Sequence, residues 1–185
     1  MYFLFKTPAI VLLVFLSLTS EIIFAQNYEA IKTDAEYFFL DSVSLNIIAI
    51  RIDSVKTLNN EINYYNFNLK TGKLITENDL FLKNTVSKLT ELIKLRIIEQ
   101  CNEDKGIKPI KNLEKTDFWI DAIKPNGNFY ITDESLNYVF NPYEIGPYYL
   151  GITEVQIPYE RMKNILKPNA TINYLIKKEK IPNSK

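Results

Sequence analysis

The segment TVSKLTELIKLRIIEQC, residues 85–101, decides the fold class because its apolar residues recur at the spacing of an α-helix. Asn84 or Thr85 can cap the start of this helix, and Gly106 is a suitable left-handed stop after its end. A helix with one apolar face needs a partner surface to cover that face. The predicted apolar face consists of Val86, Leu89, Ile93, Ile97 and Cys101, widened by Leu92.

Alternating apolar residues on both sides of this helix predict β-strands. In the first strand the alternation slips at Ile47-Ile48, which indicates either a bulge or a central strand buried on both faces. Gly72 suits the turn after the second strand, and Asp133-Glu134 joins the third to the fourth. The predicted strands cover residues 42–52, 62–69, 129–131, 136–140 and 153–157.

Two segments remain beside these strands. Pro158 suits the first turn of a final helix over residues 159–166, and residues 109–123 fit a short amphipathic helix about as well as an irregular segment. The order of elements predicts an α+β fold. We expect an antiparallel or mixed sheet with one long amphipathic helix and a short C-terminal helix packed on one face.

Both ends of the chain are predicted to lie outside the folded domain. Residues 1–25 have a positive start, a ten-residue apolar run and a small residue before Gln26, which is typical of a cleaved secretory signal peptide. We therefore expect a secreted or periplasmic protein with no stable membrane anchor after cleavage. Residues 26–167 are expected to form a single domain, and residues 168–185 a C-terminal tail or an edge strand.

Composition excludes several classes of function. The 22 Lys and Arg residues balance 22 Asp and Glu, so no excess of positive charge favours nucleic acid as a partner. The absence of histidine removes Ser-His-Asp triads and most zinc sites. We expect no cofactor and no metal, and we interpret the single Cys101 as a buried, inert thiol.

The segment NPYEIGPYYLG, residues 141–151, concentrates prolines, glycines and tyrosines. One interpretation is structural, with restricted backbone positions and tyrosines that cover a sheet edge. The other is a preorganised binding surface, because tyrosine offers a large contact area at a small entropic cost. Tyr148 and Tyr149 are adjacent, so at most one of them should be buried. The candidate binding residues are Tyr143, Glu144, Pro147, Tyr148 and Tyr149.

Carboxylates near this segment allow an enzymatic alternative. Glu144 would act as a general acid if it were buried, whereas its structural role would be to accept backbone N–H bonds within the turn. Asp133, Glu134 and Glu154 are the acids that the fold would have to bring close to it. Asp117 and Asp121 would share a helix face, where we interpret them as solvent-facing charges.

Several motifs in order resemble the C-terminal domain of the RsiV family. They are YNFNLKTGK at 65–73, NDLF at 78–81, FYIT at 129–132, the 141–151 segment and IPY at 157–159. That domain of unknown function occurs in RsiV-type lysozyme-sensing anti-sigma factors, in PdaC-type peptidoglycan deacetylases and in small exported proteins. The Gly-Gly-x-His stretch of many relatives is replaced here by TLNNE at 57–61.

The resemblance implies a fold, together with a lysozyme-like protein or a cell-wall fragment as the partner. Our leading hypothesis is an exported non-catalytic binding module that uses the Asn141–Gly151 loop. The alternatives are a carboxylate-dependent cell-wall hydrolase that uses Glu144, and an accessory structural domain without a ligand of its own.

Overall fold

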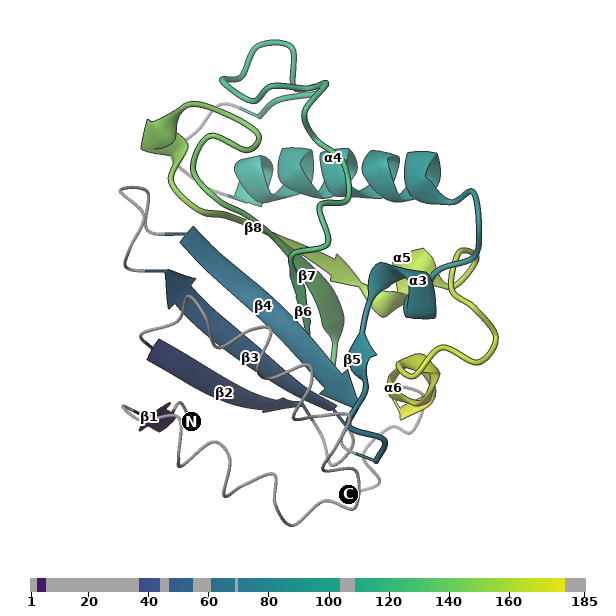
Figure 1. Cartoon of the computed structure of the whole chain (residues 1–185). Helices are drawn as coiled ribbons and strands as arrows, with labels where there is room; N and C mark the ends of the chain where they lie inside the picture. Colours follow the sequence, from purple (N-terminus) through teal and green to yellow (C-terminus); the bar gives the residue numbers. More distant parts are fainter. Residues whose placement is uncertain are drawn as a thin grey trace, which may run out of the picture. The chain divides into compact units, whose positions relative to one another are not determined.

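The computed structural model describes residues 3–5, 37–43, 47–54, 61–68, 70–103 and 109–178. Contacts divide the chain into two compact units, the first with residues 1–76 and 129–133 and the second with residues 77–128 and 134–185. Helices and antiparallel strands are both present, so the predicted α+β class is confirmed (Figure 1). The strands belong to two antiparallel sheets where a single sheet was expected.

The first unit contains a five-stranded antiparallel sheet in which each strand pairs with its neighbours in sequence. The single strand predicted over 42–52 is wrong, because Val43 and Ile47 pair across the junction of two strands. The second of these strands is central, and Ala49 and Ile50, which point to opposite faces, are both buried. The sheet order is β1 (Phe3–Phe5), β2 (Tyr37–Val43), β3 (Ile47–Ser54), β4 (Glu61–Asn68) and β5 (Leu74–Ile75).

A buried asparagine joins β6 (Phe129–Ile131) to β4 within this unit. The Asn66 side chain donates to the Phe129 carbonyl at 2.7 Å and accepts from the Ile131 amide at 3.1 Å. Asn66 is 1% exposed, so these two bonds satisfy an amide that would otherwise be costly to bury. The turn predicted at Gly72 is also confirmed, with a positive φ of 66°.

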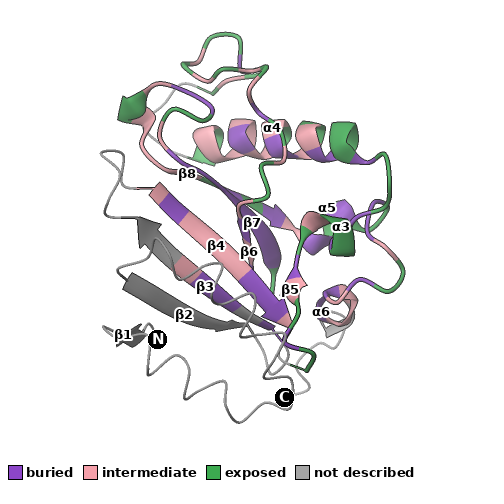
Figure 2. Ribbon diagram, in the orientation of Figure 1, coloured by how far each residue is buried: buried purple, intermediate pink, exposed green. Residues whose placement is uncertain are grey.

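The second unit contains the long helix α4 (Val86–Glu103) beside the antiparallel strands β7 (Ser135–Phe140) and β8 (Thr153–Pro158). Arg96 Nε and Gln100 Nε2 donate to the carbonyls of Gln156 and Glu154 at 2.8 and 2.9 Å, which attaches α4 to β8. Every residue of β7 is buried (Figure 2). The remaining elements are α3 (Glu77–Leu80), the 3₁₀ turn η2 (Tyr148–Leu150), α5 (Tyr159–Met162) and α6 (Asn173–Lys178).

The helix predicted from the central segment is confirmed, although only part of its predicted apolar face is buried. Leu89, Ile93 and Ile97 are buried, but Val86 is 63% exposed at the first turn. Cys101 was expected to be buried but is half-buried, and burial raises the pKa of its thiol. Gly106 lies outside the described residues.

The C-terminal part differs from the prediction. The final helix ends at Met162, although Ile165 and Leu166 are buried as expected. Residues 173–178 form α6 in place of a tail or edge strand, because Ile172 and Leu175 turn into the core together. Residues 109–123 contain turns and bends, so the irregular alternative is the correct one.

The predicted signal peptide lies mostly outside the described residues, which include only Phe3–Phe5 of its 25 positions. These three residues pair with β2. None of the described helices has the length and apolar composition needed to cross a bilayer. The signal peptide and the single domain over residues 26–167 therefore stay predictions.

Candidate functional site

The loop over residues 141–151 leaves β7 through a tight turn. The Glu144 amide donates to the Asn141 carbonyl at 3.1 Å, and Tyr143 adopts a left-handed conformation with a φ of 69°. A tyrosine in this region costs about 1–2 kcal/mol relative to an ordinary backbone conformation. The turn is therefore held in place by its surroundings.

A second connection fixes the middle of the loop against residues 117–119. Ile145 is buried, and its carbonyl accepts the Trp119 amide at 2.8 Å. Gly146 packs so closely that an added Cβ would lie 2.4 Å from Leu150 Cδ1 and 3.3 Å from the Asp117 carbonyl oxygen. Only glycine fits this approach without a displacement of its neighbours.

The loop ends in the short 3₁₀ turn η2. The Leu150 amide donates to the Pro147 carbonyl at 3.0 Å, and the Gly151 amide to the Tyr148 carbonyl at 2.9 Å. Gly151 has a φ of 64°, a conformation that glycine adopts without steric cost. Backbone hydrogen bonds thus hold the loop at its start, middle and end.

The aromatic side chains of this loop point to solvent. Tyr143, Tyr148 and Tyr149 are 55%, 47% and 68% exposed, and the rings of Tyr143 and Tyr148 lie 5.5 Å apart between centroids. The expectation that at most one of Tyr148 and Tyr149 is buried is confirmed, since both are exposed. The exposed rings of Tyr143, Tyr148 and Tyr149 together form an aromatic surface on this backbone, which we call the tyrosine loop surface.

Trp119 lies at the base of this loop and is 46% exposed. Its place beside Ile145 depends on a backbone bond between residues 26 positions apart in the sequence, so no local pattern announces it. The sequence offered one indication of this residue, since Trp119 is the only tryptophan of the chain.

Glu144 has a bracing role in the structure. Its carboxylate is exposed and accepts hydrogen bonds from the side-chain amides of Asn126 at 2.8 Å and Asn141 at 3.5 Å. The expected acceptor role is confirmed, although asparagine side chains replace the expected backbone donors. The burial that a catalytic acid at this position would need is absent.

Acidic groups lie beside the rings. A side-chain hydrogen bond to Asp117 raises the pKa of the exposed Tyr149 hydroxyl. Asp117 and Asp121 do not share a helix face, because no helix forms over residues 109–123. Within the described part of the chain, no three potential ligands gather into a group that would hold a metal ion.

Comparison with known proteins links part of the chain to a family of unknown function. Residues 78–160 match the family model described as a protein of unknown function, DUF3298. The match includes the tyrosine loop and the NDLF segment but not the strand at residues 65–73. No match is found among curated proteins.

Two solved structures described as members of the DUF3298 family are similar to this chain. A DUF3298 family member from Bacteroides fragilis is 21% identical with a TM-score of 0.58, and the alignment covers 92% of this chain and 74% of that one. A DUF3298 family protein from Pseudomonas aeruginosa is 16% identical with a TM-score of 0.48, over 88% of this chain and 79% of that one. The first of these shows a shared fold. The finer resemblance to RsiV-type domains stays a prediction.

Proposed function

We propose that this protein is an exported, non-catalytic binding module that recognises a protein of the lysozyme type through the tyrosine loop surface. The observation that supports the proposal is the exposure of Tyr143, Tyr148 and Tyr149 on a backbone held by hydrogen bonds. A loop that is already ordered pays little further entropy on binding. Tyrosine is also among the residues that dominate binding energy at interfaces.

The acidic side chains of this region favour a partner with a basic surface. The Asp117 side chain is hydrogen-bonded to the Tyr149 hydroxyl, and Glu144 adds an exposed carboxylate in the same loop, so a muramidase with a basic surface would complement them. Such pairs act mainly on the association rate and on its salt dependence. We therefore expect binding to weaken as the ionic strength rises.

The test is a calorimetric titration of the protein with lysozyme, alongside the variants Tyr148→Ser and Tyr149→Ser. Both side chains are exposed, so the variants should fold, and loss of a contact ring should weaken binding by about tenfold or more. Leu95→Ser is the matched control, because Leu95 is an exposed apolar residue of α4, outside the loop. The control should bind like the unchanged protein.

Two results would contradict the proposal. One is the absence of binding to lysozyme, and the other is unchanged affinity in a protein that carries both tyrosine substitutions. Soluble peptidoglycan fragments are titrated in parallel. If the protein bound these fragments and not lysozyme, its ligand would be a component of the cell wall and not a protein. Export is tested by mass spectrometry of the secreted or periplasmic protein, whose first residue should be Gln26.

A further inference from the structure

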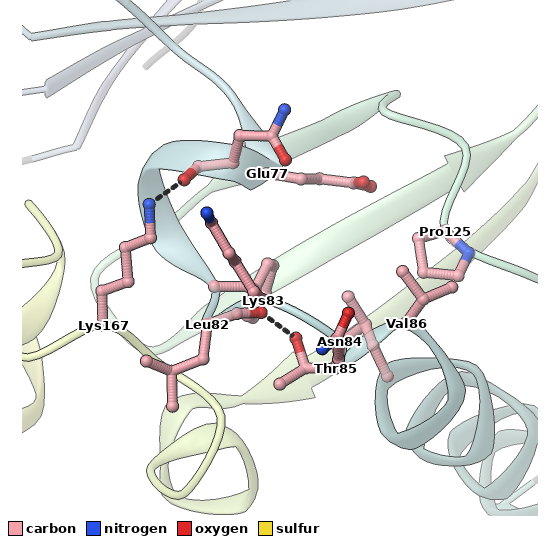
Figure 3. Close-up of a pocket in the computed structure, with 11 residues that line it drawn as sticks. Glu77, Leu82, Lys83, Asn84, Thr85, Val86, Pro125 and Lys167 are labelled. Atoms are coloured by element: carbon pink, nitrogen blue, oxygen red, sulfur yellow. Dashed lines mark hydrogen bonds between the residues drawn. The ribbon is translucent and has the colours of Figure 1, made fainter.

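A pocket of about 380 Å³ lies in the second unit, apart from the tyrosine loop (Figure 3). Small-molecule sites usually have volumes of roughly 300–1,000 Å³, so this pocket is large enough for a compact ligand. Its wall comes from three separate segments: residues 77–89, Pro125 and Lys167. We propose that it binds a small ligand with a carboxylate and a short aliphatic body, such as the C-terminal end of a short peptide.

The walls of the pocket are fixed by backbone pairing. The Leu82 amide donates to the Ile165 carbonyl at 2.9 Å, and the Lys167 amide donates to the Leu80 carbonyl at 2.8 Å. Phe81 forms an antiparallel bridge with Leu166 between these two bonds. The pairing sets Lys167 beside α3, where its ammonium group donates to the Asn78 carbonyl.

The turn that leads into α4 is fixed as well. Asn84 has a left-handed φ of 63°, and Thr85 Oγ1 donates to the Leu82 carbonyl at 2.7 Å. Figure 3 shows this turn between the Lys167 side and the Val86 side of the pocket. The pocket is therefore formed before any ligand arrives.

The charge of the lining favours an anion. Lys83 and Lys167 contribute two ammonium groups, whereas Glu77 is the single carboxylate among the lining residues. Glu77 accepts the Gly127 amide at 3.1 Å, and burial together with the nearby Glu77 raises the pKa of the Tyr138 hydroxyl. The Glu77 carboxylate therefore already accepts one hydrogen bond from the protein. Each lysine ammonium group has three N–H donors that can bind an anionic ligand.

The apolar part of the lining favours an aliphatic body. Phe81 and Leu89 are buried and provide an apolar wall, while Leu82 and Val86 stay 41% and 63% exposed. Val86 belongs to the apolar stripe of α4 by sequence, yet in the structure it lines this pocket. A ligand with a short apolar side chain would cover both exposed residues.

The test uses N-acetyl-alanyl-leucine as the probe and its C-terminal amide as the matched comparison, followed by NMR of backbone amides. The free acid should bind saturably and shift the signals of residues 82–86. Replacement of the carboxylate by the amide should weaken binding by about tenfold or more, because it removes the negative charge of the ligand and leaves only a weaker neutral acceptor for the lysine ammonium groups. Lys83→Gln and Lys167→Gln should each weaken binding of the acid.

Control variants separate this site from other effects. Lys115→Gln removes an exposed charge outside the lining and should leave binding unchanged. Val86→Glu changes a residue that is 63% exposed, so the variant should fold, and its negative charge should abolish binding. Equal binding of acid and amide, no saturable shift with the acid, or unchanged binding in Lys83→Gln/Lys167→Gln would overturn the proposal. Lysozyme binding by the tyrosine loop is independent of each outcome.

Discussion

Substitution of Gly146 by alanine tests whether the tyrosine loop is tightly packed. The new Cβ would lie 2.4 Å from Leu150 Cδ1, whereas carbon atoms in contact prefer about 3.5–4.0 Å. Leu150 must therefore retreat by about 1 Å or more, while the Asp117 carbonyl at 3.3 Å needs to yield only slightly. The φ of Gly146 is not in the left-handed region, so alanine meets no backbone obstacle.

The expected loss follows from overpacking, which costs about 1–3 kcal/mol. For a chain of this size each kcal/mol lowers the melting temperature by roughly 2–4 °C, so Gly146→Ala should lower it by about 2–12 °C. Urea unfolding gives the free energy directly. Lysozyme titration of the same variant shows whether displacement of Leu150 also disturbs the neighbouring rings.

A double-mutant cycle identifies the source of this loss. In a Leu150→Ala background the clashing Cδ1 is absent, so Gly146→Ala should cost less than about 0.5 kcal/mol. Gly127→Ala is the control, since Gly127 has a φ of 77° and nothing within 4 Å of an added Cβ. Its cost should be about 1–2 kcal/mol from the backbone alone, whatever residue 150 is. Equal losses from Gly146→Ala in both backgrounds would refute the packing argument.

Two further predictions concern α4. Arg161 and Arg96 hold the pKa of Glu99 below its ordinary value of 4.5, so their stabilising effect is present above that pH and is lost as the pH falls through the lowered pKa. Glu99→Gln should lower the free energy of unfolding at neutral pH by up to about 1 kcal/mol, and urea titrations should show the gap to the unchanged protein closing in acid; a constant gap would contradict this. Leu89→Ala should cost about 2–5 kcal/mol and the exposed Val86→Ala less than about 0.5 kcal/mol; similar costs in urea unfolding would show that both residues pack alike.

The boundary between β2 and β3 shows where pattern analysis fails. Val43, Leu45 and Ile47 continue one alternation across the junction, and no glycine or proline marks it. The two strands are separate because they pair with each other, with Val43 opposite Ile47. Pairing between strands decides such a break, and pairing is not a property of one segment.

The α6 helix gives a second example. Ile172, Tyr174 and Ile176 alternate, but three positions are too few to separate a strand from a helix. In the structure Ile172 and Leu175 are buried, a spacing of three residues that suits one face of a helix. Packing of these two side chains into the core therefore decides that the segment is a helix and not a strand.

By itself the sequence determined α4, β4, β6, β7 and β8 nearly to their ends, because periods of two and three to four residues are local properties of the chain. It also located the loop that concentrates prolines, glycines and tyrosines. Only the tertiary structure decided that the rings of that loop face solvent and that Trp119 lies at its base. The pocket beside α4 also depends on the tertiary structure, since its wall joins residues up to 90 positions apart. Exposure and long-range proximity are set by which segments pack together, and packing depends on the whole fold.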